Sequence, residues 1–312
     1  MEGFNHYSVM LKETVDGLDI KPDGVYVDCT AGGGGHSLEI VKRLSEKGHL
    51  YAIDQDINAI EAASVRLRDY LDRVTFVHDN FVNVKEALAE YGVHKIDGAL
   101  IDLGVSSYQL DTPERGFSYI SDAPLDMRMN QSARISAYDV VNTYSEKELK
   151  EIIYKYGEER FAPRIASFIV NERERNPIET TAELADIVSR AIPAATKEPG
   201  KNCCRRTFQA IRVAVNNEIE IIAPTLRNLV SMLSPGGRIS AISFHSLEDR
   251  ELKQTFTSLA SGCTCPSNFP VCVCGKKPVV KIINKKPILP TEEELAENSR
   301  SKSAKLRIAE KI

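Results

Sequence analysis

Acidic residues and a run of glycines stand where short apolar segments end, a spacing suited to holding a nucleotide-like ligand. Residues 25–28 form an apolar run that ends in Asp28, and the glycines Gly32 to Gly35 follow closely. Asp54 ends the next apolar run. Glycines allow close approach of the backbone to a ligand, and an acid at this second position accepts hydrogen bonds from ribose hydroxyls. These residues predict a ligand site at the carboxyl ends of the first strands.

The glycine run departs from the fingerprint of dinucleotide-binding proteins. A Gly-x-Gly-x-x-Gly pattern that starts at Gly32 requires glycine where this chain has Ser37. The carboxylate of Asp28 would repel a pyrophosphate and suits a ligand that carries a cation. S-adenosylmethionine carries an amine and a sulfonium but no phosphate, so this pattern favours it. Residues 233–238, Leu-Ser-Pro-Gly-Gly-Arg, also resemble a turn that methyltransferases place before a late strand.

Apolar runs that alternate with helical spacings predict the elements that position these residues. The expected strands are residues 25–28, 49–54, 74–77, 97–103, 239–244, 279–283 and 306–309. The expected helices between them are residues 36–47, 57–71, 84–91, 218–232 and 247–259. Alternating strands and helices predict an α/β fold, with a Rossmann-like and mostly parallel sheet that is covered on both faces.

The alternation stops in the middle of the chain. Residues 107–129 show no clean period, residues 145–192 have helical spacing, and a polar loop precedes another helix near Arg205. We therefore expect a discontinuous domain formed by residues 1–109 and 216–312. Residues 110–215 would form an inserted helical subdomain.

The composition limits the classes of protein. The chain has 312 residues, a hydrophobic content of 42% and a net charge of -4, which excludes disorder and a global cationic field. It shows neither a signal peptide nor an apolar run long enough to span a bilayer, so we expect a cytoplasmic protein without membrane contact. Four of its seven cysteines crowd into residues 263–274 and do not form a chain-wide disulfide framework.

Long and unusual strings then identify a family. They occur at residues 6–11, 34–37, 52–54, 102–107, 114–118, 124–129, 156–162, 206–210, 243–250 and 303–307. Among them are Asp-Leu-Gly-Val-Ser-Ser, Tyr-Gly-Glu-Glu-Arg-Phe-Ala and Ser-Phe-His-Ser-Leu-Glu-Asp-Arg. These strings run nearly end to end and closely resemble the MraW family of small-subunit ribosomal RNA methyltransferases. One departure is Cys203-Cys204, where the family usually has a His-Pro-Ala type of turn, and it puts the local substrate-side loop in doubt.

The resemblance implies a class I S-adenosylmethionine-dependent methyltransferase with a substrate-recognition insertion. It implies methylation of N4 of a cytidine in the decoding region of 16S rRNA. The residues it assigns to the methyl donor are Gly34, Gly35, His36, Asp54, Phe81, Asp102 and Gln109. The strand pattern alone favours Asp79, after the third strand, as the contact to the adenine amine. The resemblance implies Phe81 in its place, and Phe81 is our prediction. The partner would be small-subunit rRNA or the assembled small subunit, and the oligomeric state is left open.

The acceptor side requires a group that accepts hydrogen bonds and a proton from the cytosine amine. Asp102 is the first candidate, although it could serve the donor alone, and Ser106 supports it with Ser107. His245 ends the fifth strand of the core. It could orient the base or carry off a proton, and the alternative is a histidine that bonds to a neighbouring loop. For the RNA itself we select Arg128 and Arg206 from the basic residues of the insertion.

The cysteine cluster permits a second type of site. Cys263, Cys265, Cys272 and Cys274 provide four thiolates, which is the number of ligands that a tetrahedral zinc takes. The single residue between the members of each pair is shorter than the usual two. Reduced cysteines or an opportunistic disulfide are therefore the alternatives to a metal.

Other functions fit the sequence less well than RNA methylation does. The glycine pattern and Asp28 disfavour a nicotinamide-dependent oxidoreductase, and the intact Asp102 string disfavours a non-catalytic ribosome-binding factor. Physical reasoning alone does not separate RNA from DNA or protein as the acceptor. Only the family strings favour RNA, and they do not decide between naked rRNA and an assembled subunit.

Overall fold

The computed structural model describes residues 8–197, 202–262, 265, 271 and 274–312. The chain divides into two compact units, residues 1–104 with 219–312 and residues 105–218. The second unit begins and ends a few residues outside the insertion that we expected at 110–215. In the described part of the chain, no helix is both long and apolar enough to cross a membrane.

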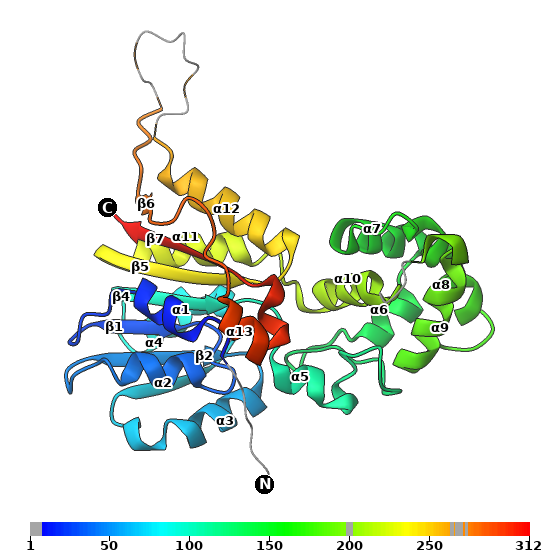
Figure 1. The fold of residues 1–312 in the computed structure, drawn as a ribbon, viewed down its shortest axis with the longest axis horizontal. Helices are drawn as coiled ribbons and strands as arrows, with labels where there is room; N and C mark the ends of the chain where they lie inside the picture. The colour runs from blue at the N-terminus through cyan, green and yellow to red at the C-terminus, as the bar shows by residue number, and fades with distance from the viewer. Residues whose placement is uncertain (1–7, 198–201, 263–264, 266–270, 272–273) are drawn as a thin grey trace. The chain divides into compact units, whose positions relative to one another are not determined.

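The first unit is built on one seven-stranded sheet (Figure 1). Its strands are β1 (Val25–Asp28), β2 (His49–Asp54), β3 (Val74–His78), β4 (Ile96–Asp102), β5 (Leu233–Ser243), β6 (Val280–Ile282) and β7 (Lys305–Lys311). They lie in the order β3-β2-β1-β4-β5-β7-β6. Strands β1 to β5 pair in parallel, whereas β7 is antiparallel to both β5 and β6. The order reverses between β1 and β4, the position where open α/β sheets bind ligands at their carboxyl edge.

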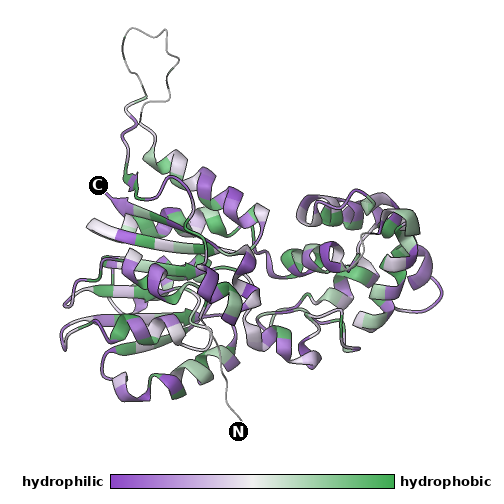
Figure 2. Ribbon diagram, viewed as in Figure 1, coloured by the Kyte–Doolittle hydropathy of each residue, from purple (hydrophilic) through white to green (hydrophobic). Residues whose placement is uncertain are grey.

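Helices cover both faces of this sheet, because successive residues of a strand point to opposite sides. In β2, Leu50 and Ala52 belong to one apolar cluster, whereas Tyr51 and Ile53 belong to another. The cluster of Leu50 includes residues of α1 (Leu11–Gly17), α2 (Gly35–Val41) and α3 (Ile57–Arg66). The cluster of Tyr51 includes residues of α4 (Val84–Glu90), α11 (Ile222–Met232) and α12 (Ser246–Ala260). Figure 2 shows hydrophilic and hydrophobic residues alternating along α12, as expected of a helix with one buried side.

Several boundaries differ from the sequence expectation. Strand β5 already begins at Leu233, so the Pro-Gly-Gly segment is a register shift within the strand and not a turn before it. Helix α2 ends at Val41 and not at residue 47, and the amides of Arg43 and Leu44 then donate three residues back, to Ile40 and Val41, in tighter turns. The sequence pattern also missed two short helices, α1 and α13 (Glu292–Glu297).

The second unit is helical. Its helices are α5 (Ser107–Asp111), α6 (Ala137–Thr143), α7 (Glu146–Gly157), α8 (Ala162–Arg173), α9 (Thr181–Ala191) and α10 (Arg205–Asn216). Reciprocal capping boxes begin α5, α6, α7 and α9, which explains why these helices start at a serine or threonine. The buried faces of these helices share one apolar cluster that includes Leu149, Ile165 and Phe208.

Candidate functional site

The glycine turn after β1 is required by packing at two positions. Gly34 has a φ of 75°, and a Cβ added there would lie 3.1 Å from the Cα of Ala63 in α3. A Cβ on Gly35 would lie 1.8 Å from the Oγ of Ser8. Gly32 has a φ of 49°, but its nearest obstacle is the carbonyl of Thr30 at 3.9 Å. Packing therefore disfavours a side chain at 34 and 35, whereas open space adjoins Gly32.

Asp54, at the end of β2, is tied to this turn. One carboxylate oxygen accepts a hydrogen bond of 2.8 Å from the amide of Gly32, and the other accepts one of 2.9 Å from the amide of Asp56. Burial raises the pKa of Asp54 to about 6, against the lowering effect of both hydrogen bonds. Each oxygen retains a further lone pair, so Asp54 can hold the turn and still accept a hydrogen bond from a ligand.

Asp28 does not have the role that the sequence suggested. It is fully buried, and its two oxygens accept hydrogen bonds from the hydroxyl of Ser37 at 2.6 Å and the amide of Thr30 at 3.1 Å. Burial raises the pKa of Asp28 to about 6. The expectation that Asp28 faces a cationic ligand was therefore wrong, because the whole residue is buried inside the turn and leaves no surface for a ligand.

Asp102, at the end of β4, retains an open acceptor atom. Its Oδ1 is buried and has no hydrogen-bond partner within the described residues, and its Oδ2 lies 3.8 Å from the Nδ1 of His36. Burial raises the pKa of Asp102 well above its usual value, and the charges of Asp28, Glu248 and Glu294 raise it further. A desolvated carboxylate with a free oxygen is suited to a hydrogen-bond donor or a cation.

His36 lies in the first turn of α2 and is buried. Its Nε2 is 3.1 Å from the carbonyl oxygen of Val9. A carbonyl only accepts, so Nε2 carries a hydrogen and donates it to Val9. The side of the ring with Nδ1 therefore faces Asp102.

The third strand end holds Asp79 and Phe81. The Oδ1 of Asp79 accepts hydrogen bonds from the amide of Asn80 at 2.6 Å and the side chain of Asn83 at 2.9 Å. Asp79 is thus engaged with its own turn. Phe81 begins the short helix that follows, η2 (Phe81–Asn83), and packs partly buried against the core cluster of Tyr51.

Ser106 and Gln109 belong to the helical unit and form the capping box of α5. The Ser106 hydroxyl accepts from the amide of Gln109 at 3.2 Å, and the Gln109 side-chain oxygen accepts from the amide of Ser106 at 3.1 Å. Gln109 is buried. The Ser106 oxygen thus caps the start of α5. Its hydroxyl hydrogen takes no part in this bond.

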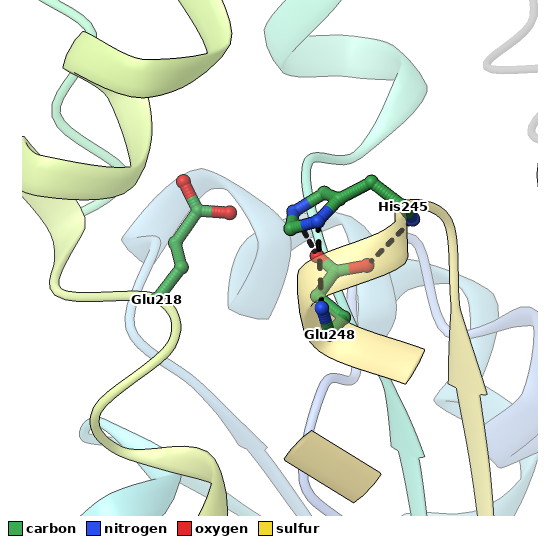
Figure 3. A group of neighbouring side chains, drawn as sticks. All are labelled: Glu218, His245 and Glu248. Carbon is green, nitrogen blue, oxygen red and sulfur yellow. Dashed lines mark hydrogen bonds and ion pairs between the residues drawn. The ribbon is translucent and has the colours of Figure 1, made fainter. Parts of the chain in front are cut away.

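His245 caps α12 together with Glu248 (Figure 3). The Nδ1 of His245 accepts from the amide of Glu248 at 3.4 Å, and its Nε2 lies 3.0 Å from the Glu248 carboxylate. Glu248 is 1% exposed and also accepts from the amides of Phe244 and His245. Glu248 was not among the predicted site residues, although the spacing of a capping box, with an acid three residues after the N-cap, could have revealed it.

The two arginines proposed for RNA differ in availability. Arg128 donates to both oxygens of Asp126 at 2.9 and 2.7 Å and to the carbonyl of Ala133 at 2.8 Å. Arg206, in the first turn of α10, has a side chain 58% exposed and lies 3.9 Å from the carboxylate of Glu159. Arg128 thus holds its own loop, whereas Arg206 presents its charge to solvent.

The cysteines fall into two groups. Cys203 and Cys204 precede α10 with their sulfurs 4.0 Å apart, and Cys204 packs in the core of the helical unit. Burial is the largest of the effects that raise the pKa of Cys204 to about 12, so this thiol is unreactive at neutral pH. In the second group, Cys263 and Cys272 lie outside the described residues, so a metal bound with Cys265 and Cys274 stays a hypothesis.

The geometry of the first unit defines a class of protein. A glycine turn after β1 and carboxylates at the ends of β2 and β4 stand at the switch in strand order, as in α/β enzymes that bind nucleotide-like ligands. The MraW methylase family matches residues 3–312 of the chain. The ribosomal RNA small subunit methyltransferase H of Clostridioides difficile (strain 630) is 58% identical over 309 residues, which cover 99% of each chain.

Further relatives carry the same name. That of Clostridium botulinum (strain Kyoto / Type A2) is 57% identical and that of Brevibacillus brevis is 53% identical, each over 309 residues and 99% of this chain. They cover 99% and 98% of those relatives. The chain belongs to the MraW methylase family. It is an S-adenosylmethionine-dependent methyltransferase with a Rossmann-like, class I α/β fold, which confirms the fold, enzyme class and cofactor expected from the sequence.

The residues at the carboxyl edge of the sheet fit this cofactor. The open oxygen of Asp102 suits an amine or a sulfonium, and the lone pairs of Asp54 suit hydroxyl groups. The open space next to Gly32 permits a ligand to approach the backbone. No phosphate-binding group is required for such a ligand.

Proposed function

We propose that this enzyme transfers a methyl group from S-adenosylmethionine to N4 of a cytidine in the decoding region of 16S rRNA. Membership of the MraW methylase family and the names of its relatives support rRNA of the small subunit as the substrate. The observation that carries the site assignment is the buried Oδ1 of Asp102 at the carboxyl edge of the sheet, which has no hydrogen-bond partner among the residues that the structure describes. The assembled small subunit is our preferred form of the substrate, because a folded decoding region presents shape as well as sequence.

The proposed donor site consists of the seven residues that the family resemblance assigns to it. They are Gly34, Gly35, His36, Asp54, Phe81, Asp102 and Gln109. Asp54 would accept hydrogen bonds from ribose hydroxyls. Phe81 is half-buried and would offer its ring to the adenine. The cofactor supplies an electrophilic methyl group, and the enzyme's task is to align the acceptor and exclude water.

The acceptor chemistry is proposed to centre on Asp102. The lone pair of a cytosine N4 amine is delocalised into the ring, so the site must accept hydrogen bonds from the amine and then take a proton. Ionised Asp102 would do both through Oδ1, with the Ser106 hydroxyl as a supporting polar group. The target base must leave its stack to enter such a site.

His245 is proposed to assist the base or its proton. We expect His245→Ala to lower the free energy of unfolding by about 1 kcal/mol, because the helix cap of α12 is lost. His245→Asn restores a cap and should recover the thermal unfolding temperature but not the methylation rate. Differential scanning calorimetry and methylation assays on both variants separate these effects. A wild-type rate in His245→Asn would leave the ring with a capping role alone.

The helical unit, residues 105–218, is proposed to recognise the RNA. Arg206 is the stronger of our two contacts, because Arg128 is already paired with Asp126. We expect Arg206→Ala to raise KM for RNA by roughly fivefold, the scale of 1 kcal/mol, with little change in KM for the donor. Arg190→Ala is the matched control, since that exposed arginine is paired with Asp186 and Glu172. Equal effects of the two substitutions would contradict a specific contact at Arg206.

The activity is tested with small ribosomal subunits that lack the modification and, separately, with their naked 16S rRNA. We expect labelled methyl groups to appear in the RNA and to elute with N4-methylcytidine on nucleoside analysis. Subunits should be better substrates than naked RNA. Label in protein or DNA, without N4-methylcytidine, would reject the proposal.

A further inference from the structure

Residues Ser8 to Met10, which we call the strap, pack directly on the start of α2. The strap is buried, with exposed fractions of 6%, 8% and 0% along its length. The hydroxyl of Ser8 occupies the space beside Gly35, where an added Cβ would lie 1.8 Å from it. The carbonyl of Val9 accepts the hydrogen of the His36 ring. The strap therefore covers two residues of the proposed donor site.

The strap is held in a conformation that its own residues do not favour. Met10 has a φ of 49° and a ψ of 39°, the left-handed region that costs an ordinary side chain about 1 kcal/mol or more. Its side chain is buried in a cluster with Ile242, Leu306 and Ile308, and its amide donates to a carboxylate oxygen of Glu294 at 2.7 Å. This bond joins the strap to a helix 284 residues further along the chain.

Glu294 lies on α13, which Figure 1 shows near α1 and α2. The Glu294 side chain is buried, and its amide is capped by the hydroxyl of Thr291 at 3.2 Å. Glu294 also lines a pocket of about 360 Å³, together with residues of α1, α2 and α13. Its burial raises the pKa of Glu294, with the charge of Glu13 adding to this effect. The buried carboxylate of Glu294 thus stabilises the left-handed backbone conformation at Met10.

The hydrogen bond between Glu294 and Met10 is connected to the donor site through Val9, which contacts the ring of His36. The Nε2–H of His36 donates a hydrogen bond to the carbonyl of Val9 in the strap. This bond favours the tautomer in which Nδ1 lies 3.8 Å from the Oδ2 of Asp102. If the strap shifts, the ring loses its hydrogen bond to the carbonyl of Val9, one of the contacts that hold it. The His36 ring then no longer holds a fixed position beside the carboxylate of Asp102.

We propose that Glu294 is a positioning residue for the methyl-donor site, because it fixes the strap and thereby the tautomer of His36 beside Asp102. This inference rests on the proposed donor role of His36 and Asp102. It assigns a function to α13, which the reaction chemistry itself does not require. No residue of α13 needs to touch the donor for this effect.

The test compares Glu294→Ala, which removes the acceptor of the Met10 amide, with Glu294→Gln, which retains an acceptor oxygen. We expect Glu294→Ala to weaken S-adenosylmethionine binding by roughly fivefold to tenfold in calorimetric titrations, the scale of one lost hydrogen bond of ordinary strength. Glu294→Gln should stay close to the wild type. Glu293→Gln, an exposed acid on the same helix, is the matched control for charge.

Nitrogen-15 NMR of labelled histidine provides a readout that general destabilisation would not change. The wild type should show the Nε2-H tautomer for His36, assigned with His36→Gln. Glu294→Ala should move these signals toward those of an unrestrained ring, and Glu294→Gln should restore them. Wild-type donor affinity and an unchanged His36 tautomer in Glu294→Ala would overturn the inference.

The experiment separates this inference from the proposed function. A wild-type enzyme that binds S-adenosylmethionine but methylates no rRNA would reject the proposed function and leave the role of Glu294 standing. A His36→Ala variant with unchanged donor affinity would overturn the role of Glu294, because the ring would then have no part in binding. Thermal unfolding of each variant confirms that the folded protein is measured.

Discussion

Asp102→Asn is expected to lower the rate of methyl transfer by about two to four orders of magnitude, the range that a general base contributes. Asparagine keeps the size of the side chain but does not take a proton. The Oδ1 of Asp102 is buried and has no hydrogen-bond partner in the part of the chain that the structure describes. We propose that the cytosine amine donates to this atom. Single-turnover methylation of small subunits with labelled donor measures the change.

The same variant tests the pH dependence. Burial raises the pKa of Asp102 well above its usual value, so the carboxylate form that accepts a proton appears only as the pH rises through this raised pKa. The wild-type rate should therefore increase with pH. The rate of Asp102→Asn should not show this increase, because asparagine does not titrate. Asp97→Asn is the matched control, because Asp97 lies at the opposite end of β4 and accepts from the amide of Val25. An unchanged rate in Asp102→Asn would restrict Asp102 to the donor site.

Asp54→Ala is expected to weaken the binding of S-adenosylmethionine by tenfold or more, about 1.5–3 kcal/mol, the range of a hydrogen bond to a charged group. Two losses contribute to this effect. The ribose hydroxyls lose their acceptor, and the amide of Gly32 loses the bond of 2.8 Å that holds the glycine turn. Calorimetric titration of the folded variant with S-adenosylmethionine measures the affinity.

Asp79→Ala is the control for this experiment. Asp79 also follows a strand, but its Oδ1 is occupied by Asn80 and Asn83. We expect a smaller change in donor affinity than in Asp54→Ala, with any effect appearing first in thermal unfolding. If Asp79→Ala lost affinity and Asp54→Ala retained it, the assignment of the ribose contact to β2 would be contradicted.

Much of the fold and of the donor edge could be predicted from the sequence, because the signals are local. Apolar runs end at Asp54 and Asp102, and parallel strands bring their carboxyl ends to one edge. The glycines after β1 indicated a turn with positive φ, which Gly32 and Gly34 adopt. The family strings named the reaction, which physical reasoning on single residues did not separate from other methyl transfers.

The sequence by itself thus determined the class of fold, the cofactor and the strand ends that carry the acids. Only the tertiary structure decided how each charged side chain is used. It buries Asp28 under Ser37, pairs Arg128 with Asp126, and joins Met10 to Glu294 across most of the chain. Burial and hydrogen-bond partners come from residues distant in sequence, and together they set which polar atoms stay open to a ligand. A pattern of residue types along one segment does not contain that information.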